Sequence, residues 1–272
     1  MRGLRHLKTI GIGLAVALAL AACATKKDVE SPPKPEDLGI TDRVLHYQNE
    51  LKTAPDNPEL HYKLGNALLD MGRYQDAYYS YQKAINLKPD YADAYSNLGF
   101  ALRKIGNLKA AAGAYVHALD INPGDITTLN NLVVVAQLLE DWEQAAWCYE
   151  RLVSLQPDDN ELLAGYADLL YGLGRFEEAL PLYTILTTRQ VDPVRSQFRV
   201  GLCYADLERW AEAAEAWERA RSLEPENVSV NRSLPVAYWE AGKKAEAQAA
   251  VKRCQELGIE LDPEFLREMG SG

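Results

Sequence analysis

The sequence predicts an all-α chain, a solenoid of six helix-turn-helix repeats with a capping helix at each end. Three series of residues at steps of 34 carry this prediction: one is mostly aromatic, one is alanine and one is proline. A fixed period of this length is the sequence signature of stacked repeats, because a single repeat cannot bury its apolar faces alone. The series are Tyr47, Tyr81, Tyr115, Tyr149, Tyr183, Trp217 and Val251; Ala77, Ala111, Ala145, Ala179, Ala213 and Ala247; and Pro55, Pro89, Pro123, Pro157 and Pro225.

Residues 1–22 have the pattern of a secretory signal peptide. Arg2, Arg5 and Lys8 form a basic start, and residues 10–22 are apolar without a charge. A transmembrane helix needs roughly twenty apolar residues, so this run is too short to be one. A basic start, a short apolar run and small residues at its end favour export.

The end of that run, Leu20-Ala21-Ala22-Cys23, resembles the lipobox of bacterial lipoproteins. The resemblance implies diacylglycerol on the Cys23 thiol, cleavage just before Cys23 and acylation of the new amino group. Two or more acyl chains hold a protein firmly at a membrane. Ala24, in place of Asp, favours the outer membrane by resemblance to proteobacterial sorting. The alternative is an ordinary signal peptide with an incidental cysteine. Residues 23–36, rich in proline at their end, then form a semi-rigid lipidated tether.

Six units of 34 residues make up the body. Residues 58–91 contain a Leu-Gly pair in the first helix, a glycine in the turn, and aromatic and small residues before a closing proline. These residues are Leu64, Gly65, Gly72, Tyr74, Ala77, Tyr81, Ala84 and Pro89. This pattern resembles the tetratricopeptide repeat, and the resemblance implies a right-handed superhelical solenoid with a concave face. The units are 58–91, 92–125, 126–159, 160–193, 194–227 and 228–261.

Segments on both sides of the repeats are expected to cap the stack, as a solenoid needs to stay soluble. In residues 37–57, Tyr47 and Leu51 lie on a helix in phase with the second helices of the repeats. Residues 262–272 form a short charged helix, with Pro263 near its start, where proline is favoured.

Three departures from the repeat pattern predict local changes. Val133 stands where a glycine is usual, so we expect the third hairpin to be slightly splayed. Repeat four has Val191 in place of its closing proline and Pro193 two residues later, which predicts an altered stacking angle at residues 189–194. Pro235 falls inside the first helix of repeat six and either kinks that helix or shortens it to start near Ser233.

In the tetratricopeptide family the first helix of each hairpin lines a groove, so the resemblance implies a protein-binding groove here. Asn97 and Asn131 occupy the same repeat position, and their amides either pair with a bound peptide backbone or satisfy neighbouring helices and water. The apolar residues of this groove either mark an interaction surface or are buried by adjacent helices. The implied groove residues are Tyr62, Asn66, Asn97, Phe100, Arg103, Asn130, Asn131, Val134, Leu138, Phe198, Leu202 and Trp239.

The carboxylate clamp of chaperone-binding relatives is not reproduced. Asn66 and Asn97 fit its pattern, but Tyr62 and Thr127 stand where its lysines would be. A chaperone tail is therefore not the expected partner.

Composition excludes several function classes. Removal of residues 1–22 takes the net charge from −10 to −13, and an acidic chain without a basic block lacks the footprint of a nucleic-acid binder. Cys148, Cys203 and Cys254 resemble core residues more than a metal site, although one disulfide stays open. We find no catalytic motif. The sequence thus predicts no enzyme activity, no cofactor, no metal and no small-molecule substrate.

The remaining prediction is a scaffold that is held by lipid, faces the periplasm of a Gram-negative bacterium and binds a protein partner. In anchor, repeat number and leading half-repeat, the chain resembles the six-repeat lipoproteins that serve as pilotins for type IV pilus secretins. That resemblance implies a secretin subunit as the partner. Two alternatives are an adaptor for peptidoglycan hydrolases or envelope proteases, and a component of a β-barrel or tight-adherence pilus assembly machine.

Overall fold

A computed structural model describes residues 39–271, and within that range the chain forms fourteen α-helices and no strand. The predicted signal peptide, the lipidated tether with Cys23 and the first two residues of the predicted cap lie outside the described residues. The helices are α2 (Ile40–Thr53), α3 (Pro58–Asp70), α4 (Tyr74–Leu87), α5 (Ala92–Ile105), α6 (Leu108–Ile121), α7 (Ile126–Leu138), α8 (Trp142–Leu155), α9 (Asn160–Gly172), α10 (Phe176–Thr188), α11 (Pro193–Asp206), α12 (Trp210–Leu223), α13 (Val228–Glu240), α14 (Lys244–Glu256) and α15 (Pro263–Ser271).

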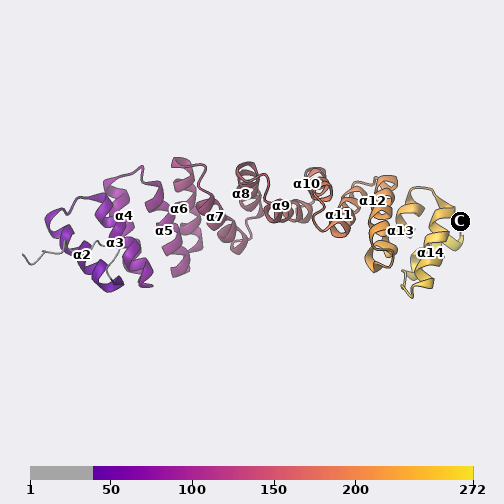
Figure 1. Ribbon diagram of the computed structural model, residues 1–272, viewed down its shortest axis with the longest axis horizontal. Coiled ribbons are helices and arrows are strands. Elements are labelled where there is room, and N and C mark those ends of the chain that lie inside the picture. The colour runs from indigo at the N-terminus through magenta and orange to yellow at the C-terminus, as the bar shows by residue number, and fades with distance from the viewer. Residues whose placement is uncertain (1–38, 272) are drawn as a thin grey trace, which may run out of the picture.

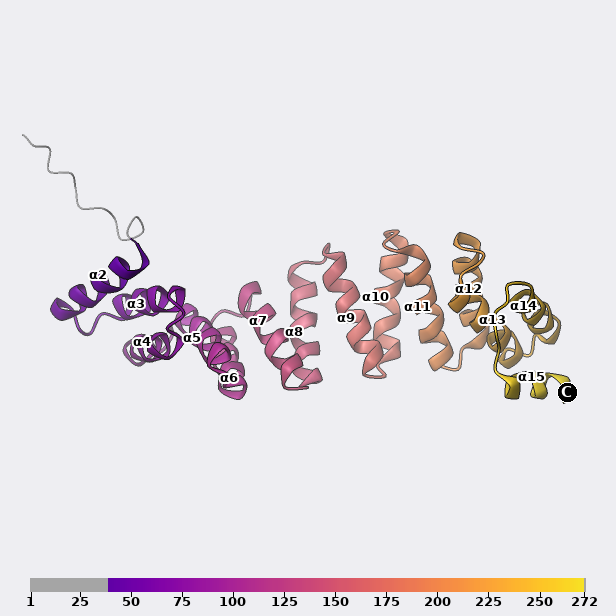
Figure 2. The same ribbon diagram turned by 90° about the horizontal axis from the view of Figure 1, so that it is seen from below.

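The helices from α3 to α14 form six hairpins that follow one another along the long axis of the molecule (Figure 1). The view in Figure 2 shows the same succession, with α2 beside α3 at one end and α15 at the other. Arg43 of α2 makes an ion pair of 3.0 Å with Asp70 of α3, which helps to hold the first helix on the stack. The predicted all-α superhelical solenoid is confirmed.

A tight turn with one residue in the left-handed region joins the two helices of each hairpin. Glycine fills this position in four hairpins, at Gly72, Gly106, Gly174 and Gly242. The third and fifth hairpins have Glu140 and Glu208 there instead, with φ of 56° and 57°. A residue with a Cβ pays a steric penalty in this region, so two of the six turns are strained.

Glycines of the first helix let an aromatic ring of the second helix approach its backbone closely. A Cβ added at Gly65 would come within 2.5 Å of the Tyr81 ring, and one at Gly99 within 2.7 Å of the Tyr115 ring. Both tyrosines are fully buried. The glycine in the repeat is therefore required by this close approach.

Val133 removes this arrangement from the third hairpin. The Tyr149 ring lies instead parallel to that of Tyr166 in the next repeat, with centroids 6.2 Å apart and planes 11° apart. Tyr149 also faces Gly165, where an added Cβ would be 3.4 Å from the ring. The departure at Val133 thus redirects one aromatic side chain; the splaying of this hairpin stays a prediction.

Buried apolar side chains form three successive groups along the solenoid. The first extends from α2 to α8, the second from α8 to α12 and the third from α12 to α14. Tyr149 packs against both the first and the second group, and Tyr204 against both the second and the third. These two tyrosines connect the groups into one long core.

Helix α13 continues through Pro235 from Val228 to Glu240, so the shortened helix that starts near Ser233 is wrong. Proline has no N–H, which leaves the carbonyl of Asn231 without its usual helical donor. The Cys254 thiol of α14 donates to that carbonyl over 3.1 Å. The Cys254 side chain of the second helix thereby satisfies the Asn231 carbonyl, which Pro235 leaves without a helical donor.

The connection between repeats four and five is irregular. Gln190 and Asp192 both have positive φ, at 60° and 40°, and α11 begins at Pro193 immediately after them. Asp192 caps that helix by accepting from the backbone N–H of Arg195. Val191 stands in place of the closing proline of the repeat, and the linker around it is distorted. The altered stacking angle between repeats four and five stays a prediction.

Candidate protein-binding face

The first helices place their predicted groove residues on one face, and residues 31 apart meet across adjacent repeats. Asn66 Oδ1 accepts hydrogen bonds from the Tyr81 hydroxyl at 2.7 Å and from Asn97 Nδ2 at 2.8 Å. Asn97 Nδ2 also lies 3.4 Å from the Tyr62 hydroxyl, which accepts. The Asn97 amide donor is therefore engaged within the fold, in agreement with the alternative in which asparagines satisfy neighbouring helices.

The fourth and fifth repeats contain a second self-satisfied cluster with the same spacing. Asp168 accepts from the Tyr183 hydroxyl at 2.5 Å and from Arg195 at 3.0 Å, and it lies 3.4 Å from Arg199, 31 residues later. Burial and the Asp168 carboxylate raise the pKa of Tyr183, so the hydroxyl stays protonated and donates. Here too the polar groups of the face find partners inside the protein.

In repeats two and three, which lie between these two clusters, the repeat position that supplies the acceptor Asn66 or Asp168 has no polar side chain. Phe100 stands where repeat one has Asn66, and Asn131 stands where repeat two has Asn97. The Tyr115 hydroxyl and Arg103 Nε are both buried without a hydrogen bond of acceptable geometry, and the Asn131 side-chain amide makes no hydrogen bond within residues 39–271. Burial raises the pKa of Tyr115 to about 12, and the nearby Arg103 guanidinium opposes part of that rise.

Apolar residues are exposed in the same region. Val134 is 41% exposed and Leu138 is 59% exposed, one and two turns after Asn131 on α7. Asn130, on the same helix, is also exposed. Exposed apolar side chains that adjoin one another mark an interaction surface more often than isolated ones do.

The other apolar groove residues are largely covered. Phe198 and Leu202 are half-buried and pack against the third core group, and the Trp217 indole donates to the Phe198 carbonyl over 3.0 Å. Trp239 is half-buried, with the Lys244 ammonium 5.3 Å from its ring centroid. The alternative of burial by adjacent helices therefore applies to repeat five, whereas repeat three keeps its apolar residues open.

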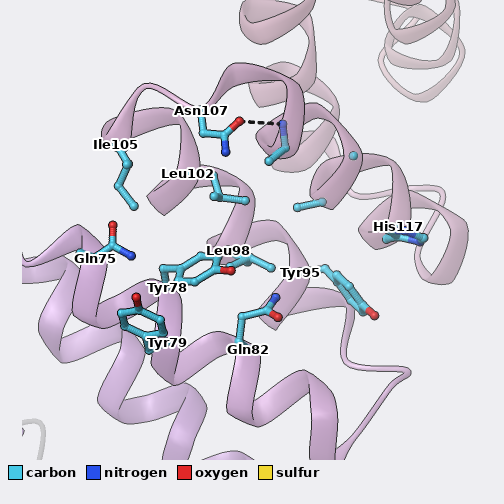
Figure 3. A pocket seen from close by; sticks show the side chains of 13 residues that line it. Gln75, Tyr78, Tyr79, Gln82, Tyr95, Leu98, Leu102, Ile105, Asn107 and His117 are labelled. Carbon is cyan, nitrogen blue, oxygen red and sulfur yellow. Dashed lines mark hydrogen bonds between the residues drawn. The ribbon is translucent and has the colours of Figure 1, made fainter.

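Sequence reasoning missed a cavity of about 620 Å³ between α4, α5 and α6 (Figure 3). Its α5 side carries Tyr95, Leu98 and Leu102, which lie away from Phe100 because a helix turns by about 100° per residue. Gly113, a glycine inside α6, borders this space, and an added Cβ there would meet nothing within 4 Å. Aromatic, apolar and amide side chains line it: Gln75, Tyr78, Tyr79, Gln82, Tyr95, Leu98, Leu102, Ile105, Asn107, Ala110, Gly113, Ala114 and His117.

The described residues offer no group of three or more potential metal-ligating side chains. None of the helices in residues 39–271 combines the length and apolar character that a membrane crossing requires. Cys148, Cys203 and Cys254 are free and buried, and burial raises the pKa of the first two to about 12. They are core residues, and the disulfide that the sequence left open does not form among them.

A stack of helical hairpins whose first-helix face combines unpaired polar groups with exposed apolar residues defines a protein-interaction scaffold. Models of the tetratricopeptide repeat match residues 135–193, 167–225 and 201–260, and further models of the same repeat match 65–106 and 92–125. The chain belongs to the tetratricopeptide-repeat family.

Individual relatives share the fold at low sequence identity. Tetratricopeptide repeat protein 1 of Schizosaccharomyces pombe is 31% identical over 78 residues, which are 28% of this chain and only 7% of that relative's length. The crystal structure of YrrB, described as a tetratricopeptide-repeat protein with an unusual peptide-binding site, is 21% identical with a TM-score of 0.51, over 68% of this chain and 95% of YrrB. The structure of Naa15/Naa10 bound to HypK-THB gives 15% identity and a TM-score of 0.71, over 87% of this chain and 36% of the other.

Proposed function

We propose that this protein is a scaffold anchored in the outer membrane through Cys23, and that it binds a protein partner on its first-helix face. The observation that carries the binding role is the open part of that face, where Val134 and Leu138 are exposed beside the unpaired Asn131 amide. The peptide-binding site reported for YrrB supports the same kind of role. The anchor rests on the lipobox resemblance.

The partner that we propose is a subunit of a type IV pilus secretin, which makes the protein a pilotin. The proposed lipid anchor, the six repeats and the leading helix α2 support this assignment together. A pilotin brings secretin subunits to the outer membrane and promotes their assembly. A deletion strain should therefore lose secretin multimers and twitching motility, and expression of the wild-type gene should restore both. Normal multimers in the deletion strain would remove the pilotin assignment.

Two variants test which face binds. Val134→Glu places a charge on the open part of the first-helix face, and Tyr79→Glu places the same charge at the cavity between α4, α5 and α6, where Tyr79 is 60% exposed. We expect affinity capture from native membranes to lose its main partner with Val134→Glu and to keep it with Tyr79→Glu. The opposite result would move binding to the cavity between α4, α5 and α6. Peptidoglycan hydrolases among the captured proteins, in place of a secretin, would support the adaptor function.

The anchor has a test of its own. Wild-type protein should incorporate labelled palmitate and fractionate with the outer membrane, and Cys23→Ala should do neither. Incorporation of label by Cys23→Ala would contradict the anchor.

A further inference from the structure

Helix α4 carries a row of aromatic and amide side chains that occurs in repeat one only. The spacing of its four members places them on one side of the helix; they are Gln75, Tyr78, Tyr79 and Gln82. The corresponding positions hold Lys, Ala, Gly and Val in repeat two, and Glu, Ala, Trp and Glu in repeat three. The packing of the solenoid therefore does not require this row.

The row lies along one wall of the cavity of about 620 Å³ between α4, α5 and α6 (Figure 3). Tyr95 of α5 lines the same space, and α6 adds only small side chains at Ala110 and Gly113. Small-ligand sites have volumes of roughly 300–1,000 Å³, so this cavity has a suitable size. Tyr79 is 60% exposed at its rim, and an open cavity of this kind accepts a section of a longer, chain-like ligand.

The polar groups of this cavity are available to a ligand. Asn107 Oδ1 caps α6 by accepting from the backbone N–H of Ala110, which leaves its Nδ2 donor over. Several groups that line the cavity make no hydrogen bond within residues 39–271: Asn107 Nδ2, the amides of Gln75 and Gln82, and the hydroxyls of Tyr78, Tyr79 and Tyr95. Each side-chain amide of glutamine offers both donors and an acceptor. The cavity thus presents donors and acceptors together, beside aromatic rings.

The walls of the cavity carry no formal charge. None of the 13 lining residues is Asp, Glu, Lys or Arg, although a quarter of the chain is charged. A bound ion would lose water here without gaining a counter-charge, which is costly. A purely apolar ligand would leave the hydroxyls and amides unused. The ligand that fits these walls is therefore uncharged, with apolar faces and a polar edge.

We propose that this cavity binds an uncharged, β-linked oligosaccharide, in addition to the protein partner on the first-helix face. A β-linked pyranose presents C–H groups on its faces and hydroxyls along its edges. The C–H face packs on the Tyr79 ring, and the hydroxyls pair with the Gln75 and Gln82 amides, since both kinds of group donate and accept. A proline-rich peptide also packs on aromatic rings, but proline has no N–H and would leave the amide oxygens without donors.

Saturation-transfer NMR on the full-length protein, in a detergent without a sugar headgroup, tests this site. The probes are cellotetraose and chitotetraose, which are uncharged and β-linked, and tetramannuronate, which is β-linked and acidic. We expect transfer from the protein to both uncharged probes and none to the acidic one. A stronger signal from chitotetraose would identify an N-acetylated glycan as the source of the ligand, and a stronger signal from cellotetraose would identify an unmodified glucan.

Three variants locate the binding. Tyr79→Ala should weaken the affinity for the uncharged probes about tenfold, through loss of the aromatic ring that the sugar packs on. Gly113→Leu should abolish binding by filling the cavity, while the fold stays helical by circular dichroism, because an added Cβ meets nothing within 4 Å. The matched control is Trp147→Ala, which removes an exposed ring at the repeat position of Tyr79, from a cavity that Glu150 and Arg151 line. This control should bind the probes as the wild type does.

Several outcomes would overturn the saccharide site. These are no transfer to either uncharged probe, equal affinities for the wild type and Tyr79→Ala, and loss of binding in Trp147→Ala. Binding of tetramannuronate alone, or of a decaproline peptide in place of the oligosaccharides, would overturn it too. The capture of a protein partner from native membranes is a separate measurement on a separate face, so the scaffold function stands or falls independently of these results.

Discussion

Tyr149 stacks on Tyr166 of the following repeat, with ring planes 11° apart, although its equivalents Tyr81 and Tyr115 lie on glycines of their own hairpins. The difference comes from Val133, whose side chain occupies the space above the first-helix backbone. As a result Tyr149 is packed against the first and the second core group at once. Tyr149 is thereby one of the side chains that couple the N-terminal half of the solenoid to the C-terminal half.

Tyr149→Ala should uncouple these halves. Loss of a large, partly buried aromatic side chain should cost about 2–4 kcal/mol, and coupling in a solenoid depends on the interfaces between neighbours. All five tryptophans lie at residue 142 or later, in repeats three, five and six. Tryptophan fluorescence therefore reports on these repeats, while far-UV circular dichroism reports on every helix. We expect the two signals to give different urea midpoints for this variant. Tyr78→Ala, within the first core group, should keep them coincident, and coincident midpoints for Tyr149→Ala would contradict the coupling.

Gly99 and Gly113 should respond in opposite ways to the same substitution. A Cβ at Gly99 would approach the buried Tyr115 ring to 2.7 Å, whereas one at Gly113 would meet nothing within 4 Å. Gly99→Ala should therefore lower the free energy of unfolding by about 1–3 kcal/mol through overpacking. Gly113→Ala should raise it by about 0.5–1 kcal/mol, since alanine favours a helix interior. Urea denaturation of both variants measures the difference, and effects of the same sign would refute this view of the two glycines.

The sequence predicted the helices and their stacking well because each repeat buries the same kinds of residue at the same positions. The packing of Tyr149 on Tyr166 was not predictable from the 34-residue repeat. It depends on where the Tyr149 ring lies once the Val133 side chain fills the space that a glycine leaves in the other hairpins. The Asn97 amide donates to Asn66 of the preceding repeat. Asn131 has no such partner, because Phe100 stands at the position that Asn66 has in repeat one. Gly113, a glycine inside a helix without a packing partner, was the one available signal of the cavity.

The strained turns at Glu140 and Glu208 predict an increase in stability on substitution by glycine. Both residues have positive φ at the position where the other four hairpins have glycine. Relief of the Cβ clash should raise the free energy of unfolding by about 1 kcal/mol in Glu140→Gly. Gly174→Ala introduces the same clash into the fourth hairpin, where φ is 74°, and should lower the free energy by a similar amount. Thermal and urea denaturation are the measurements, and a destabilised Glu140→Gly would show that this turn carries no strain.

Alkaline pH should destabilise the fold through its buried thiols and phenols. Burial raises the pKa of Cys148, Cys203 and Tyr115 to about 12, whereas in the unfolded chain cysteine has a pKa of about 8.5 and tyrosine of about 10. Above the unfolded pKa values the unfolded chain binds fewer protons than the folded one, so stability falls as pH rises. The stabilisation is complete below about pH 8.5 and is lost progressively toward pH 12.

The contribution of a single thiol can be isolated with Cys148→Ala. Each group that ionises only in the unfolded state contributes a slope of about 1.4 kcal/mol per pH unit. The free energy of unfolding, measured by urea denaturation in steps from pH 8 to pH 11, should therefore fall less steeply in Cys148→Ala than in the wild type. The comparison of slopes is independent of any constant cost of the substitution. Identical slopes in the two proteins would mean that the Cys148 thiol ionises equally in the folded and unfolded states, and that burial does not protect it.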